Sequence, residues 1–103
     1  MTVTRLPQAA AELLEEVRAD PVGWPSIDLH KLLSMCGFTS SEPLKTAQGW
    51  DVPLRYHPEH PDLNVVLFPT ERVHIAVTLH VVRIIDTLTA RLAQSGAHGS
   101  TSA

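Results

Sequence analysis

The first part of the chain carries hydrophobic residues at helical spacing. Four apolar positions within residues 6–19 recur at i, i+3, i+4 and i+7: Ala10, Leu13, Leu14 and Val17. They lie on one side of a helix whose opposite side is mostly acidic. Pro7 suits a first helical turn, and Pro21 prevents the helix from continuing. The pattern predicts an amphipathic helix over residues 6–19.

A second helix is predicted to begin at Ser26. Ser26 is a suitable N-cap, Asp28 is favourable in the first turn, and Gly37 is a natural C-terminal stop. Its buried stripe consists of Leu29, Leu32, Leu33 and Cys36.

Beyond Gly37 the helical period gives way to short segments separated by turn residues. Residues 63–68 form the clearest strand, because they are β-branched and apolar and lie between Pro61-Asp62 and Pro69-Thr70. Residues 52–57 and 38–46 are predicted to form two further strands. Pro53 places its strand at an edge or a bulge.

Residues 72–93 fit two patterns. Residues 73–81 alternate between apolar and more polar side chains, as in a strand, whereas apolar positions from Val77 to Leu92 form a helical stripe. The length of the helical pattern favours a helix from Val77 to Ala93, with an extended lead-in at 72–75. Leu79 and Val82 give this helix a second apolar strip, which needs a cover of its own.

The order of elements predicts an α+β domain. Two helices precede three strands and one helix follows them, which is typical of an antiparallel meander covered by helices. We expect a three-stranded antiparallel sheet packed by two helices in residues 26–95. Residues 1–25 add an N-terminal helix and a linker, and the small, polar residues 96–103 are expected to be disordered.

Composition narrows the functional classes. The 103 residues include 8 Lys+Arg and 11 Asp+Glu, for a net charge of −3, which argues against a strongly basic nucleic-acid binder. One cysteine, Cys36, excludes an intramolecular disulfide, and neither a signal peptide nor an apolar run of membrane-spanning length is present. The expected location is the cytoplasm, without a membrane partner. No phosphate-binding loop or dinucleotide fingerprint points to a cofactor.

From Ser26 onward the chain resembles the HicA-type mRNA interferase toxins. The residues that carry the resemblance are Met35 to Phe38 (MCGF), Gly49, Tyr56-His57-Pro58, Val65-Val66-Leu67 with Pro69, and Thr78-Leu79. The resemblance covers about two thirds of the chain. It implies a fold like that of a double-stranded RNA-binding domain (dsRBD-like), and a role in RNA or toxin–antitoxin biology with an antitoxin-like protein as partner.

The chain departs from this family at the catalytic position. In the family, the glycine before the second strand is followed by a serine and then by the histidine held to cleave RNA. Here Gly49 is followed by Trp50-Asp51, so the family histidine falls on Asp51 or, with one inserted residue, on Val52. An ordinary aspartate is mostly ionised above about pH 5 and is a poor proton shuttle at neutral pH. The resemblance therefore implies a member without cleavage activity.

His57 and His60 are the candidate catalytic residues if activity persists. A histidine at the end of the second strand would serve as a displaced base where it faces an RNA groove. The pair also has the i, i+3 spacing of metal ligands, but a zinc site needs at least one more ligand, from His74 or His80. The simplest interpretation is a turn with two solvated histidines, and we predict no metal site.

Two further sets of residues are candidates for contacts with partners. The predicted RNA contacts are Lys45, Trp50, Arg55, His80, Arg83 and Arg91. The predicted protein contacts, in a homodimer or with another protein, are Leu13, Leu14, Val17, Leu79 and Val82. A solvated helix surface is the alternative for the first set.

The leading hypothesis is a non-catalytic RNA-binding or toxin–antitoxin regulatory module. An interaction or dimerisation module that uses the N-terminal helix is one alternative. An active ribonuclease with a relocated histidine, His57 or His60, is the other.

Overall fold

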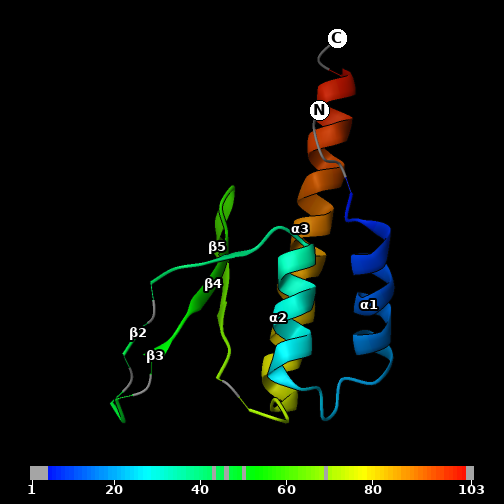
Figure 1. The fold of residues 1–103 in the computed structure, drawn as a ribbon. Coiled ribbons are helices and arrows are strands. Elements are labelled where there is room, and N and C mark those ends of the chain that lie inside the picture. The colour runs from blue at the N-terminus through cyan, green and yellow to red at the C-terminus, as the bar shows by residue number, and fades with distance from the viewer. Residues whose placement is uncertain (1–4, 43, 46, 50, 69, 102–103) are drawn as a thin grey trace.

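The computed structural model describes residues 5–42, 44–45, 47–49, 51–68 and 70–101. Three helices, α1 (Gln8–Ala19), α2 (Ser26–Met35) and α3 (Ile75–Thr101), lie side by side, and a small antiparallel sheet lies beside them (Figure 1). The chain is thus α+β, with a three-stranded sheet, two helices around it and an additional N-terminal helix, as the sequence predicts. Within the described residues, no helix is long and apolar enough to cross a membrane.

Helix α1 belongs to the hydrophobic core. Ala10, Leu14 and Val17 are buried, and α1 packs against both α2 and α3. The prediction of a helix in residues 6–19 is confirmed. The suggestion that Leu14 and Val17 contact a partner is wrong, because these side chains are covered by the chain's own helices.

The three-stranded sheet has the order β1-β4-β5, with β1 at Thr39–Ser40, β4 at Leu54–His57 and β5 at His60–Val66. Two shorter strands, β2 (Leu44–Lys45) and β3 (Asp51–Val52), pair separately. The predicted strand 38–46 is therefore two strands, and the predicted strand 52–57 is interrupted at Pro53, which has no N–H to donate to a ladder. Strand β5 begins at His60, so the hairpin turn lies at Pro58-Glu59 and not at Pro61-Asp62.

Helix α3 resolves the ambiguity of residues 72–93. It begins at Ile75, so the helical interpretation is confirmed and the alternating pattern of residues 73–81 does not form a strand. The lead-in is held by the linker before α2: the Val73 N–H donates to the carbonyl of Trp24 (2.7 Å), and the Ser26 N–H donates to that of Thr70 (3.1 Å). The helix continues to Thr101, so residues 96–101 are helical where disorder was expected.

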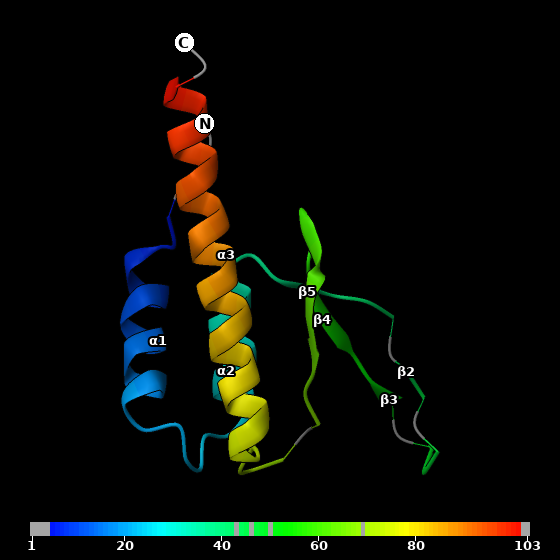
Figure 2. The same ribbon diagram turned by 180° about the vertical axis from the view of Figure 1, so that it is seen from behind.

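A single core joins the helices to one face of the sheet. Fully buried side chains come from α2 (Leu29, Leu32 and Leu33) and from α3 (Val81, Ile85 and Leu88). The sheet adds Leu63 and Val65 of β5, whose alternation with more exposed neighbours fits a strand with one covered face. Figure 2 shows α3 in front of α2, with α1 on one side and β5 on the other. The side of α3 that points away from α2 is thus left open between α1 and the sheet.

Candidate functional site

His57 and His60 meet across the hairpin turn between β4 and β5. Their ring centroids are 5.2 Å apart, and the His57 ring also packs at nearly a right angle to that of Phe38, with centroids 5.5 Å apart. Nδ1 of His57 accepts a hydrogen bond from the Glu59 backbone N–H at 3.2 Å, so this nitrogen carries no proton of its own. Burial, and then the charge of His60, lower the pKa of His57, while Glu59 opposes the shift.

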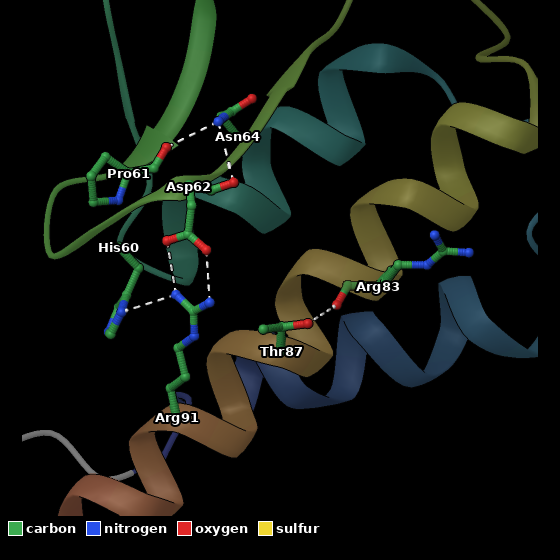
Figure 3. Close-up of polar contacts among 7 residues, drawn as sticks. All are labelled: His60, Pro61, Asp62, Asn64, Arg83, Thr87 and Arg91. Carbon is green, nitrogen blue, oxygen red and sulfur yellow. Dashed lines mark hydrogen bonds and ion pairs between the residues drawn. The ribbon is translucent and has the colours of Figure 1, made fainter.

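The His60 ring lies beside an ion pair between α3 and β5. Arg91 Nη1 lies 3.4 Å from Nδ1 of His60, and the same guanidinium binds the Asp62 carboxylate through two bonds of 2.9 and 2.7 Å (Figure 3). The hydrogen bonds with Arg91 hold the pKa of Asp62 below its ordinary value, and those with Asp62 raise the pKa of Arg91. Arg91, a predicted RNA contact, is therefore engaged by its own chain.

The turn between β4 and β5 thus brings together two imidazoles, one carboxylate and one guanidinium, from His57, His60, Asp62 and Arg91. These side chains are not placed to form a metal site. The described residues hold no group of three or more His, Cys, Asp or Glu side chains placed to bind a metal ion. His80 contacts the Asn64 backbone carbonyl through Nε2 at 3.0 Å, and Nδ1 of His74 accepts the Ala76 N–H at 3.1 Å. Both histidines thus bond to backbone groups. His74 accepts from an N–H in the first turn of α3, and His80 contacts a carbonyl of β5. No local pattern in the sequence indicates either of these backbone contacts.

Arg55 points into the junction of α2 and the sheet. Its guanidinium donates to the Ser34 hydroxyl at 2.6 Å and to the Ser40 hydroxyl at 3.1 Å, and it approaches the carbonyls of His30 and Phe38, each at 3.4 Å. Burial lowers the pKa of Arg55. This arginine joins two elements of the fold, and these contacts within the chain compete with the phosphate binding predicted for it.

Two other predicted RNA contacts lie around the β2–β3 hairpin. Lys45 is exposed, and its ammonium is 3.9 Å from the carboxylate of Asp51. Trp50 lies outside the described residues. An acidic side chain beside Lys45 weakens the attraction of this hairpin for phosphate.

The open side of α3 carries a shallow, wide-open hollow lined only by this helix. We call it the outer face of α3, defined by Leu79, Val82, Arg83, Asp86, Thr87 and Ala90. Leu79 is 48% exposed, whereas Val82 is nearly buried. Of the predicted protein contacts, Leu79 is therefore available to a partner, Leu13 is half-buried against the core, and Val82 lies at the floor of the hollow.

Asp86 on this face binds α1. Its carboxylate accepts two hydrogen bonds from Arg18, at 2.9 and 2.5 Å, and these bonds raise the pKa of Arg18. Arg83 is exposed and, within the part of the chain that the structure describes, forms no ion pair. Among the predicted RNA contacts that the structure describes, Arg83 is thus the arginine whose guanidinium stays exposed to solvent without an ion pair.

Cys36 is buried on α2, where desolvation raises the pKa of its thiol to about 11. It is therefore a poor nucleophile at neutral pH.

Comparisons with protein-family models, with curated proteins and with solved structures found no match to this chain.

Proposed function

We propose that this protein is a non-catalytic, HicA-like module that acts by binding another protein through the outer face of α3. The observation that carries the proposal is a contrast between two surfaces. The cations expected to meet phosphate are largely engaged within the chain, whereas an apolar hollow on α3 stays open. Open apolar surface with a polar rim is typical of protein contacts.

The order of elements supports the HicA-like part of the proposal. From α2 onward the chain runs helix, three antiparallel strands and helix, which is the order that the resemblance implies. The two inserted strands β2 and β3 extend the hairpin between β1 and β4. The resemblance assigns the family's catalytic histidine to Asp51 or Val52, which are the two residues of β3, whereas the His57–His60 pair lies elsewhere, at the β4–β5 turn.

Charge supports a protein partner over RNA. Arg91 and Lys45 each have an acidic neighbour, Arg55 is turned inward, and His80 bonds to a backbone carbonyl. A net charge of −3 adds long-range repulsion toward phosphate. Nucleic-acid binders instead gather several free cations on one surface.

The test has two parts. The purified protein is mixed with a labelled RNA hairpin at low salt, where electrostatic binding is strongest, and we expect neither binding nor cleavage. The protein is then co-expressed with the product of an adjacent reading frame. We expect co-purification that Leu79→Glu abolishes and that Ile27→Glu, a change at a 73% exposed apolar residue on α2, leaves intact. Binding of RNA that Arg83→Ala removes would overturn the proposal.

A second candidate function is RNA cleavage by the His57–His60 pair. The observation that favours it is the 5.2 Å separation of the two rings together with the Arg91 guanidinium beside His60. Two imidazoles and a cation can supply a base, an acid and charge stabilisation for phosphoryl transfer. If this candidate is right, the protein cleaves RNA, and alanine at both histidines abolishes cleavage while the fold persists. Cleavage that survives the double substitution rules it out.

A further inference from the structure

The sheet has an open edge at β5. Its order is β1-β4-β5, so within the described residues no strand pairs with β5 on the side away from β4. The Leu54 carbonyl on β4 accepts the Ser41 N–H at 2.9 Å, so the backbone groups of Leu54 point toward the β1 side. Its partner Val66 on β5 is therefore in a non-hydrogen-bonded pair and points its N–H and C=O away from β4, as does Asn64 two residues earlier.

A side chain of α3 supports this direction. Nε2 of His80 lies 3.0 Å from the Asn64 carbonyl, so this oxygen points toward the open edge. The Asn64 N–H and both backbone groups of Val66 remain, and among the described residues no contact outside the sheet satisfies them. Open donors and acceptors at a sheet edge are a template for another strand. A helix has its own backbone groups paired along its length, so this edge selects an extended chain.

A groove runs between this edge and the first turns of α3, which lie side by side in Figure 2. It is lined by Asn64, Val65, Val66, Ala76, Val77 and His80. Val65 is buried on the helix-facing side of β5, and a residue opposite it in an added strand points its side chain to the same side. That side chain lies over Ala76, an exposed residue whose methyl group leaves room for it. The groove therefore fits an apolar side chain of medium size.

The charge beside the groove is positive. Strand β5 and helix α3 run in opposite directions, since Asn64 meets His80 while Asp62 meets Arg91. Arg83 follows His80 by one turn on the same side of α3, so it is level with the part of β5 between Asn64 and Asp62. Arg83 is exposed and, among the described residues, forms no ion pair. A carboxylate in an added strand can therefore pair with it.

We infer that the edge of β5 binds an extended segment of a partner protein, which adds a strand to the sheet. The segment has an apolar residue opposite Val65 and, two positions further along, an acidic residue on the same face that pairs with Arg83. A second copy of β5 does not fit this description, because its one carboxylate, Asp62, is held by Arg91. The inference goes beyond the proposed function, since the site adjoins the outer face of α3 without including Leu79.

The test uses the isotope-labelled full-length protein and a synthetic peptide of about eight residues, the length of a strand. The peptide alternates threonine with valine and has aspartate in place of one central valine. In the free protein, NMR should show fast amide exchange at Asn64 and Val66 and slow exchange at Val65, which pairs with Arg55. Bound peptide is expected to slow exchange at Asn64 and Val66 at least about tenfold. The same peptide N-methylated on its threonines keeps its side chains and should not bind.

Two variants locate the site. Val66→Pro removes an N–H that takes no part in the pairing with β4, and should weaken peptide binding about tenfold. Val66→Thr is its control, because it keeps both the N–H and the shape, and binding should be unchanged. Ala76→Phe fills the groove and should also weaken binding, whereas Ala90→Phe, at an exposed alanine further along α3, should not. Since position 76 is exposed, Ala76→Phe tests the site even if Val66→Pro unfolds.

An exchange of charges tests the acidic position. A peptide with lysine in place of aspartate is expected to bind about threefold more weakly, and Arg83→Glu should reverse this preference. A protein that does not bind the peptide, binding that survives N-methylation, or binding that is insensitive to both Val66→Pro and Ala76→Phe would each overturn the inference. Protection of Asn64 and Val66 that appears on concentrating the protein alone would assign the edge to a second copy, and would also overturn it.

The inference and the proposed function fail separately. A protein that does not bind the peptide but captures the product of an adjacent reading frame through Leu79 refutes the β5 site and retains the docking function. A protein that binds the peptide at β5 and also binds the RNA hairpin through Arg83 refutes the proposed function and retains the β5 site.

Discussion

Arg55 on β4 donates to the hydroxyl of Ser34 on α2 across 2.6 Å, and this bond anchors the sheet to the helix that packs on it. The same guanidinium reaches Ser40 on β1 at 3.1 Å. Three elements, α2, β1 and β4, are therefore joined by one side chain. Its partners are hydroxyls and carbonyls, so shape and hydrogen bonding hold it in place, and within the described residues no carboxylate forms an ion pair with it.

Arg55→Ala is expected to lower the free energy of unfolding by about 1 kcal/mol or more, because it removes the hydrogen bonds to two hydroxyls and to two part-buried carbonyls. Urea denaturation followed by circular dichroism measures the change. Ser40→Ala, which removes one of these contacts at an exposed hydroxyl, should cost less. A variant at position 55 as stable as the wild type would show that the hydrogen bonds of Arg55 contribute nothing to stability.

Protonation of His57 is expected to destabilise the fold. Burial lowers its pKa in the folded state, and burial together with the charge of Arg55 lowers that of His30. Since the unfolded chain binds these protons more tightly, stability is fully present above about pH 6.5 and falls as pH decreases toward the folded pKa values. Unfolding free energies measured between about pH 8 and about pH 5 test this.

His57→Gln supplies the control for the pH dependence. Its stability should vary less with pH over the same interval, because only His30 of the two then contributes. An unchanged slope would assign the acid sensitivity to other groups.

Leu14→Ala is expected to cost about 2–5 kcal/mol, as large-to-small changes in a core do. Leu14 is 4% exposed and packs within the common core of the three helices. Leu13→Ala, on the half-buried neighbour, should cost clearly less in the same denaturation experiment. Equal costs would contradict the orientation of α1.

Because α1 is part of the core, deleting it cannot show whether α1 contacts a partner. Removal of residues 1–22 takes Ala10, Leu14 and Val17 out of the core and should leave a poorly folded chain. Loss of a dimer on this deletion would therefore not place the contact on α1. Point substitutions on the outer face of α3 are the sharper test.

Periodic patterns predicted the helices and the order of elements, whereas contacts between distant side chains had no local signal. The spacing of Leu29, Leu32 and Leu33 marked α2 correctly, because a helix repeats its buried side within a few residues. Nothing near Arg91 in the sequence indicates that it binds Asp62, since that pair forms only when α3 lies along β5. Sequence patterns are short in range, so they did not reveal that four of the predicted RNA contacts have partners elsewhere in the chain.

The start of β5 shows the same limit for turns. Pro61-Asp62 was expected to be outside the strand, because proline lacks an N–H for pairing. The structure keeps Pro61 in β5, an edge strand of the sheet, where a proline is tolerated. This shift brings His60 opposite His57. The short spacing of the two histidines in the sequence suggests that they lie near each other. Their direct pairing depends on the register of β4 and β5, which the spacing does not determine.

Thr78→Val is expected to stabilise the protein by up to about 1 kcal/mol, since an unpaired buried hydroxyl costs free energy that a methyl group of the same shape does not. Thr78 is 0% exposed, and within the described residues its Oγ1 has no hydrogen-bond partner. Chemical denaturation measures the gain. Thr87→Val is the matched control, because Oγ1 of Thr87 donates to the Arg83 carbonyl at 3.0 Å on a half-exposed side of the same helix, and we expect a change within about 0.5 kcal/mol there. Destabilisation by valine at position 78 would mean that its hydroxyl is bonded in solution and contributes to the packing of α3 on the core.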